Sequence, residues 1–121
     1  MPRHILEEAQ LHPAIRARVA RNGLDIVDEV RAALAADRIV VVGMRGNPMC
    51  RRARRTLTAA GAEHRYLEYG SYFSEWRRRN ALKMWTGWPT FPMVFVGGTL
   101  VGGATDLERL IQAGELQQRP G

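Results

Sequence analysis

Residues 86–107, TGWPTFPMVFVGGTLVGGATDL, decide the fold of this chain. β-Branched and aromatic residues dominate 93–96 and 99–101, and the pair Gly97-Gly98 separates these two runs. A glycine pair readily takes the positive φ angles that a two-residue hairpin turn requires. The stretch therefore predicts two antiparallel strands joined at these glycines.

The rest of the chain alternates helical and extended patterns around this hairpin. Residues 39–42 form a continuous β-branched run, which predicts a strand buried on both faces. In the helix predicted over 72–85, the apolar positions are expected to be Phe73, Trp76, Leu82 and Trp85. The other predicted elements are a helix in 25–37, a helix from 48 to 60 ended by Gly61, a strand in 64–69, and a last helix capped by Thr105 or Asp106 and ended by Gly114.

These segments run in the order α-β-α-β-α-β-β-α after residue 23. A strand–helix–strand unit, a crossing helix, a hairpin and a closing helix describe the thioredoxin fold, an α/β fold in which helices flank a four-stranded mixed sheet. We expect this domain at 24–114. Residues 1–23 are interpreted as an N-terminal arm with one short amphipathic helix, and 115–121 as a C-terminal tail.

The composition is ordinary for a single soluble domain. Of the 121 residues, 45% are apolar and 25% charged. No apolar run reaches the roughly 20 residues of a membrane span. A lone cysteine excludes an internal disulfide and fits a cytoplasmic location, and the scattered histidines offer no metal-site spacing. The net charge of +6 favours an anionic ligand, a nucleic acid or an acidic partner.

Two motifs in 86–107 resemble the second half of the glutaredoxin family, whose members show W-P-T-x-P, a hairpin and then G-G-x-[DS]-D. Here the motifs are residues 88–92, WPTFP, and 102–106, GGATD, and no gap is needed between them. The likeness covers about residues 24–114. It implies a monothiol-like relative that binds glutathione and serves redox homeostasis as an oxidoreductase.

The resemblance also implies where glutathione binds. Phe91 would pair its main chain with the cysteinyl part of glutathione, and the peptide bond to Pro92 is expected to be cis. Thr90 lies beside this turn. Glycines let a ligand approach the main chain, and the start of the last helix offers free N–H groups to a carboxylate. The γ-glutamyl end would be held there by Gly103, Ala104, Thr105 and Asp106.

Basic residues fall where relatives bind the glycyl carboxylate of glutathione. Arg79 and Lys83 match the basic pair of monothiol members, and Arg45 lies near the lysine that ends the first strand in relatives. Any one of them alone is more often a solvated surface residue. Their predicted convergence on one groove favours a binding site.

The segment NPMC, residues 47–50, holds the only cysteine and allows two alignments to the family. Active members carry C-P-[YF]-C or C-G-F-S here, and the first cysteine is the nucleophile. Without gaps, Asn47 replaces that nucleophile and Cys50 takes the second-cysteine position. The second alignment matches the K-G…P-x-C of monothiol members to Arg45-Gly46 and Pro48-Met49-Cys50. It makes Cys50 the nucleophile, but it needs two compensating deletions.

Helix geometry favours the ungapped alignment. At about 100° per residue, Ala53, Leu57 and Ala60 share one apolar stripe, and Cys50 flanks it. Cys50 should therefore lean towards the core, while Asn47 caps the helix. An asparagine cannot form a mixed disulfide, and it removes the thiolate with which relatives hold an iron–sulfur cluster. Within the first turn and beside arginines, Cys50 retains a route to a lowered pKa.

Three functions remain open from the sequence. The first is glutathione-dependent thiol–disulfide exchange with a protein disulfide through Cys50, weakened by the loss of the usual nucleophile at Asn47. The second is a non-catalytic module that binds glutathione, an iron–sulfur cluster or a protein partner, with the cluster disfavoured. The third, also disfavoured, is nucleic-acid binding through residues 51–55, RRARR, and 76–79, WRRR, because such arginines equally form a solvated surface.

Overall fold

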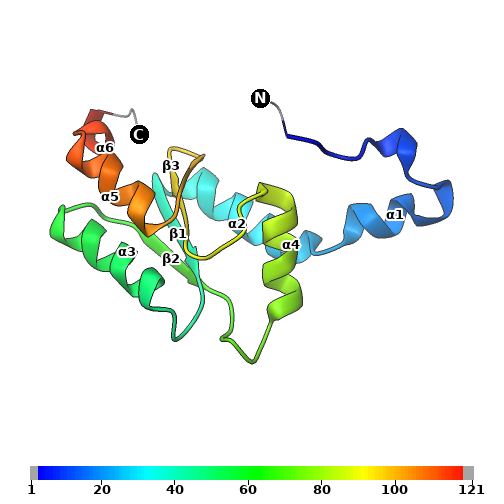
Figure 1. Ribbon diagram of the computed structural model, residues 1–121, viewed down its shortest axis with the longest axis horizontal. Helices are drawn as coiled ribbons and strands as arrows, with labels where there is room; N and C mark the ends of the chain where they lie inside the picture. The colour runs from blue at the N-terminus through cyan, green and yellow to red at the C-terminus, as the bar shows by residue number, and fades with distance from the viewer. Residues whose placement is uncertain (1–2, 119–121) are drawn as a thin grey trace.

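A four-stranded mixed sheet forms the centre of the computed structural model, which describes residues 3–118 (Figure 1). The strands are β1 (Ile39–Gly43), β2 (Arg65–Glu68), β3 (Met93–Val96) and β4 (Thr99–Gly102), in the spatial order β2-β1-β3-β4. β1 pairs parallel with β2 and antiparallel with β3, and β3 pairs antiparallel with β4. Gly97 and Gly98 have φ angles of 57° and 77°, as the predicted hairpin turn requires. The predicted thioredoxin fold is confirmed.

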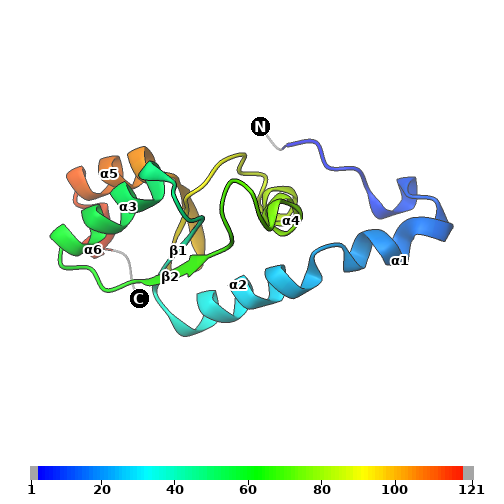
Figure 2. The ribbon, with the colours of Figure 1, turned by 90° about the horizontal axis from the view of Figure 1, so that it is seen from below.

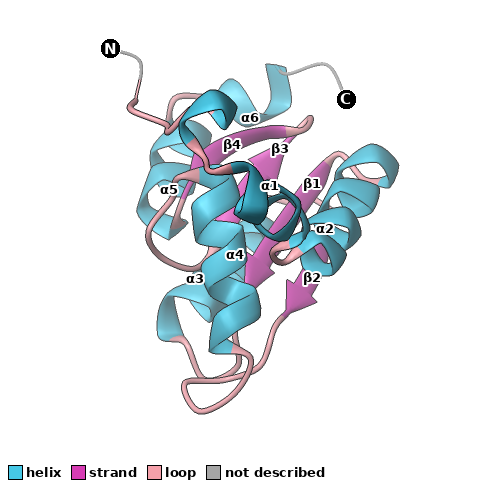
Figure 3. Cartoon of the chain, turned by 90° about the vertical axis from the view of Figure 1, so that its right-hand side faces the viewer, coloured by secondary structure: helices cyan, strands magenta, loops and turns pink. Residues whose placement is uncertain are grey.

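Helices cover both faces of the sheet because β1 is apolar on both sides. Val40 and Val42 pack with α2 (Leu24–Ala36) and α4 (Trp76–Thr86). Ile39 and Val41 point the other way and pack with α3 (Pro48–Ala59) and α5 (Ala104–Gln112). Figure 2 shows these two helix pairs on opposite sides of the strands, and in Figure 3 the magenta strands lie behind α4. The continuous β-branched run is therefore a strand buried on both faces, as predicted.

The N-terminal segment extends from α2 away from the sheet (Figure 2). It contains a short 3-10 helix, η1 (Glu8–Gln10), and α1 (Pro13–Arg21), in which no residue is buried. At the start of the segment, before η1, the chain lies close to α4, where Arg3 Nη1 donates a hydrogen bond to the Thr86 carbonyl oxygen at 2.8 Å. Within residues 3–118, no helix has the length and apolar character needed to cross a bilayer.

The helix predicted over 72–85 begins later than expected, at Trp76. Phe73 lies in the preceding turn with 96% of its surface exposed, and Trp76 is 54% exposed. The prediction that these two side chains face the core was wrong, because the chain turns outward before α4 begins. Leu82 is buried and Trp85 is partly buried, as predicted.

The last helix begins earlier than expected. Its N-cap is Gly103, so the prediction that Thr105 or Asp106 caps it was wrong. Asp106 lies in the first turn, where its carboxylate accepts a hydrogen bond from the main-chain N–H of Gly103 at 3.0 Å. Beyond Gly114, the segment interpreted as a tail forms α6 (Glu115–Gln118), and Leu116 is buried beside α5 and the sheet.

Candidate functional site

The start of α3 places Asn47 at the tip of the helix. Its Oδ1 accepts hydrogen bonds from the main-chain N–H groups of Met49 and Cys50, at 2.9 and 3.1 Å. Pro48 occupies the first helical position, where the missing N–H costs nothing. The predicted N-cap role of Asn47 is confirmed. The amide thus supplies a hydrogen-bond acceptor for two N–H groups of the first turn. It stands at the position where the ungapped alignment puts the family's nucleophile.

Cys50 lies inside the protein, as the helical stripe predicted. Only 1% of its surface is exposed. A Cβ atom placed on Gly43 would lie 2.8 Å from the Cys50 sulfur and 2.9 Å from Cε1 of Tyr66, so the glycine makes room for both side chains. The sulfur is therefore enclosed between β1 and the Tyr66 ring.

Burial also sets the protonation state of Cys50. Desolvation raises the pKa of the thiol, while a main-chain hydrogen bond at Met44 and the charge of Arg51 lower it by less. The carboxylate of Glu68 raises the pKa further. The expectation of a lowered thiol pKa was wrong, because the loss of hydration outweighs the charge of Arg51. A neutral, enclosed thiol is a poor nucleophile.

The Phe91–Pro92 peptide bond is cis, as predicted from the motif. Phe91 is buried, Thr90 is exposed, and Lys83 on α4 holds its Nζ 5.7 Å from the centroid of the Phe91 ring. This turn therefore brings a cation from α4 to the residue predicted to offer its main chain to a ligand.

The start of α5 lies beside the same turn. A Cβ atom on Gly103 would lie 3.6 Å from the carbonyl oxygen of Pro92 and 3.9 Å from Nε1 of Trp88. Ala104, Thr105 and Asp106 occupy the first three helical positions, whose N–H groups have no acceptor within the helix. The structure thus gathers the predicted γ-glutamyl residues next to Pro92.

Trp88 is a residue of this site that the sequence reasoning did not select. Its Nε1 is buried and has no hydrogen-bond partner among residues 3–118. A buried donor without an acceptor is unfavourable in the free protein, so a ligand that supplies one would gain affinity. The position of Trp88 at the head of the W-P-T-F-P motif was the available signal. This unpaired donor beside the free N–H groups of α5 fits a ligand rich in carboxylates and carbonyls.

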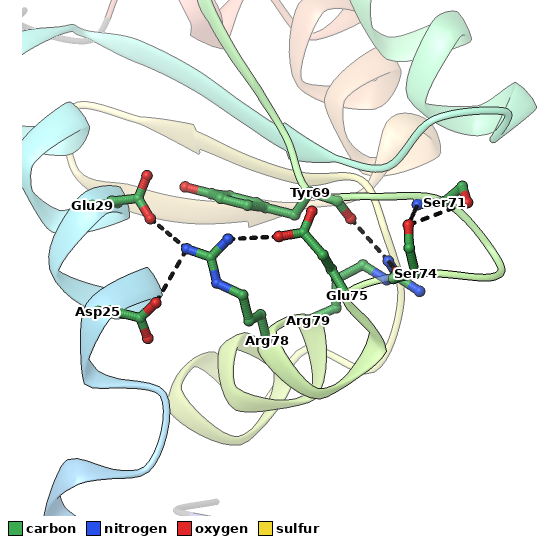
Figure 4. A network of polar contacts seen from close by, with 8 residues as sticks. All are labelled: Asp25, Glu29, Tyr69, Ser71, Ser74, Glu75, Arg78 and Arg79. Atoms are coloured by element: carbon green, nitrogen blue, oxygen red, sulfur yellow. Dashed lines mark hydrogen bonds and ion pairs between the residues drawn. The ribbon is translucent and has the colours of Figure 1, made fainter.

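Of the other two predicted basic residues, Arg79 is taken up by the protein itself. It is buried, and its Nη1 donates to the carbonyl oxygens of Tyr69 at 2.8 Å and Ser74 at 2.5 Å (Figure 4). Arg79 is therefore not a solvated surface residue. The predicted contact between Arg79 and a carboxylate of the ligand stays a prediction. Arg45 is exposed, and its main-chain N–H donates to the carbonyl oxygen of Gly70 at 2.7 Å.

The residues present do not fit an iron–sulfur cluster held by this chain. Such a cluster needs an accessible thiolate, whereas Asn47 offers an amide and the Cys50 sulfur is enclosed. Within residues 3–118, no three His, Cys, Asp or Glu side chains gather where they could hold a metal ion. Two surface hollows, both bordered by Thr58 and His64, contain no residue of the candidate site.

Comparison with known proteins gives consistent matches. Residues 39–101 match the family model Glutaredoxin. The chain is 46% identical over 92 residues to the Glutaredoxin-like protein of Dictyostelium discoideum, and the aligned region covers 76% of this chain and 75% of that protein. It is similar to the holo form of glutaredoxin C1 from Populus tremula x tremuloides, with 25% identity, a TM-score of 0.69 and coverage of 81% and 88%. It also shares the fold of the buckwheat glutaredoxin–glutathione complex, at 23% identity, a TM-score of 0.69 and coverage of 80% and 88%.

Proposed function

This chain belongs to the glutaredoxin family, and we propose that it binds glutathione without attacking disulfides. The binding site consists of the Phe91–Pro92 turn, the start of α5, Trp88 and Lys83. A solved relative of the same fold is a complex with glutathione, which supports this choice of ligand. The partly buried amide of Asn47, which has no nucleophilic sulfur, occupies the position where the ungapped alignment puts the nucleophile of active members.

Complementary charges support glutathione as the ligand. Its γ-glutamyl end carries a carboxylate and an ammonium group, and its glycyl end carries a second carboxylate. The N–H groups at the start of α5 and the positive end of the helix dipole suit the first carboxylate. Asp106 lies in that same turn and suits the ammonium group. Lys83, beside Phe91, suits the glycyl carboxylate.

The proposal that this protein does not catalyse thiol–disulfide exchange rests on one observation, the burial of Cys50. Thiol–disulfide exchange requires a thiolate that reaches a disulfide sulfur in line. Cys50 is 1% exposed, and burial raises the pKa of its thiol. At the helix tip, where a sulfur would be accessible, stands the side chain of Asn47.

The decisive experiment separates binding from turnover. Binding of reduced glutathione is measured by calorimetry, and turnover by reduction of a mixed disulfide between glutathione and a small thiol. We expect the wild type and Cys50→Ser to bind glutathione equally and to show negligible turnover. Asn47→Cys should gain turnover, whereas the matched variant Asn47→Ser, which also caps the helix, should not. Wild-type turnover that is lost in Cys50→Ser would overturn the proposal.

The binding site itself is tested by charge removal. Lys83→Gln should weaken glutathione binding by roughly tenfold, the loss expected for one hydrogen bond to a charged group. Arg109→Gln removes the same charge from an exposed residue in the last turn of α5 and should leave the affinity unchanged. Equal weakening by both substitutions would mean that only the net charge matters and would contradict the assigned site.

A further inference from the structure

The exposed face of α3 carries three arginines at helical spacing. Arg51, Arg54 and Arg55 follow one another at i, i+3 and i+4, so their side chains leave the helix on one face. α3 contains no acidic residue that could compensate these charges. Like charges about one turn apart destabilise a helix. A bound anion would relieve this repulsion.

The three arginines border a surface hollow of about 670 Å³. A hollow of this size is in the range of small-molecule sites, roughly 300–1,000 Å³. The remaining residues of its wall are Thr58, Ala59 and His64. The hollow therefore combines three guanidinium groups with a hydroxyl and an imidazole, and its wall contains no carboxylate.

Tyr66 orients Arg54 at the edge of the hollow. The guanidinium carbon of Arg54 lies 4.1 Å from the centroid of the Tyr66 ring on β2. A guanidinium that lies over an aromatic ring keeps its N–H groups, which lie in its own plane, available to an acceptor. Because Arg54 is oriented before a ligand arrives, less conformational entropy is lost on binding.

Two ion pairs beside the hollow contribute no net charge. Arg52, the fourth arginine of α3, pairs with Glu108 of α5 at 2.6 Å. Arg65 of β2 pairs with Asp37. Each pair joins one positive and one negative charge, so neither compensates the three arginines of the hollow.

Two further carboxylates, those of Glu63 and Glu68, belong to the segment that follows α3. The Glu68 carboxylate accepts a hydrogen bond from the Tyr66 hydroxyl at 3.2 Å. Within residues 3–118, neither carboxylate forms an ion pair with the arginines of the hollow. Even when both are counted in full against these three arginines, and His64 is neutral, one positive charge remains. The hollow therefore favours an anionic ligand.

The cationic surface is too short for an extended nucleic-acid strand. RRARR belongs to α3 and WRRR to α4, and these helices lie on opposite faces of the sheet (Figure 2). Beyond Thr58 and His64, the adjoining hollow is bordered by two carboxylates, Asp37 and Glu63, and by one arginine, Arg38. The row of cations thus ends with the first hollow, and a compact polyanion fits it better than a strand does.

We propose that this hollow binds the diphosphate or triphosphate group of a small molecule. Guanidinium groups donate to phosphate oxygens through paired N–H groups, and the Thr58 hydroxyl adds one donor. Adjacent phosphates place several negative charges close together, which matches three arginines along about 6 Å of helix. A lone carboxylate would engage only one of them. The group belongs either to a nucleotide or to free polyphosphate, and binding requires neither glutathione nor a thiol.

The test titrates the full chain with inorganic pyrophosphate, adenosine diphosphate and sulfate, at near-physiological salt that screens nonspecific attraction. NMR amide shifts report the position and the affinity. Pyrophosphate and adenosine diphosphate should bind with dissociation constants at or below about 1 mM and shift the amides of 51–59 and His64. Sulfate should bind at least about tenfold more weakly, because it reaches fewer of the arginines. Tighter binding of adenosine diphosphate than of pyrophosphate would identify a nucleotide, and equal binding would identify free polyphosphate.

Substitutions separate the site from net charge. Arg55→Gln should weaken pyrophosphate binding by about tenfold, the loss expected for one hydrogen bond between charged groups. Arg55→Lys keeps the charge without the paired N–H groups and should recover only part of the affinity. Arg18→Gln removes the same charge from an exposed residue of α1, on the segment that extends away from α3 (Figure 1), and should leave the affinity unchanged. Both positions are exposed, so these variants should fold like the wild type.

Several outcomes would overturn the proposal. These are no saturable binding of pyrophosphate at millimolar concentration, sulfate binding as tight as that of pyrophosphate, and equal weakening by Arg55→Gln and Arg18→Gln. Shifts centred on Gly103, or displacement of pyrophosphate by glutathione, would place the anion at the start of α5 and would also overturn it. Tighter binding of oligothymidylate than of pyrophosphate would do the same. None of these results decides whether glutathione binds, which is measured separately.

Discussion

Removal of the cap at the start of α3 should open a path to Cys50. The Oδ1 of Asn47 accepts two main-chain hydrogen bonds in that first turn, at 2.9 and 3.1 Å. Replacement of such a cap by alanine costs about 1 kcal/mol. Since 1.4 kcal/mol corresponds to about a factor of ten, conformers with the first turn open should become about five times more populated.

Alkylation of Cys50 by iodoacetamide reports these conformers directly. With 1% of its surface exposed and its thiol pKa raised by burial, Cys50 should react in the native state only when the turn opens. At neutral pH we expect wild-type alkylation to be at least about a hundredfold slower than that of free glutathione, given local opening costs of a few kcal/mol. Asn47→Ala should react about fivefold faster than the wild type, and Asn47→Ser, which retains a cap, at nearly the wild-type rate.

Two results would refute this reasoning. Wild-type alkylation as fast as that of glutathione would show that the sulfur is accessible, and the proposal of a non-catalytic site would fail with it. Equal rates in Asn47→Ala and Asn47→Ser would show that the cap does not control access to Cys50. Urea unfolding of the same variants measures the loss of global stability, so that local and global opening can be separated.

Three further predictions concern stability, measured by urea unfolding. Because burial raises the pKa of the Cys50 thiol, the folded state holds the thiol proton more tightly than the unfolded state does. The protonated thiol therefore contributes to the free energy of unfolding in full below the ordinary thiol pKa of about 8.5. This contribution is lost as the pH rises towards the folded pKa, by up to about 1.4 kcal/mol per pH unit. Cys50→Ala should reduce this alkaline slope, and an unchanged slope would contradict the assignment. Gly43→Ala should cost about 1–3 kcal/mol, since its Cβ would lie 2.8 Å from the Cys50 sulfur and 2.9 Å from Tyr66 Cε1. That cost should shrink when Cys50→Ala is also present. Leu116→Ala should cost about 2–5 kcal/mol if α6 belongs to the core, whereas exposed Gln112→Ala should change stability by less than about 0.5 kcal/mol.

Much of the fold and part of the site could be predicted because their signals are local or periodic. The glycine pair Gly97-Gly98 specifies its turn through φ angles available to each residue alone. The cap at Asn47 depends on N–H groups two and three residues away. The burial of Cys50 follows from the helical repeat that it shares with Leu57. In each case, the cause and its effect lie within about seven residues, the length of two helical turns.

Only the tertiary structure decided which side chains the neighbouring elements cover. Phe73 and Leu82 are both apolar residues of one predicted helix, yet one is exposed and the other buried. Arg79 is an ordinary basic residue in the sequence but binds two carbonyl oxygens inside the protein. The unpaired Trp88 Nε1 arises only where the turn before β3 meets the start of α5. Burial is set by segments that are distant in sequence and adjacent in space, and a periodic pattern in one segment does not specify which other segment will cover it.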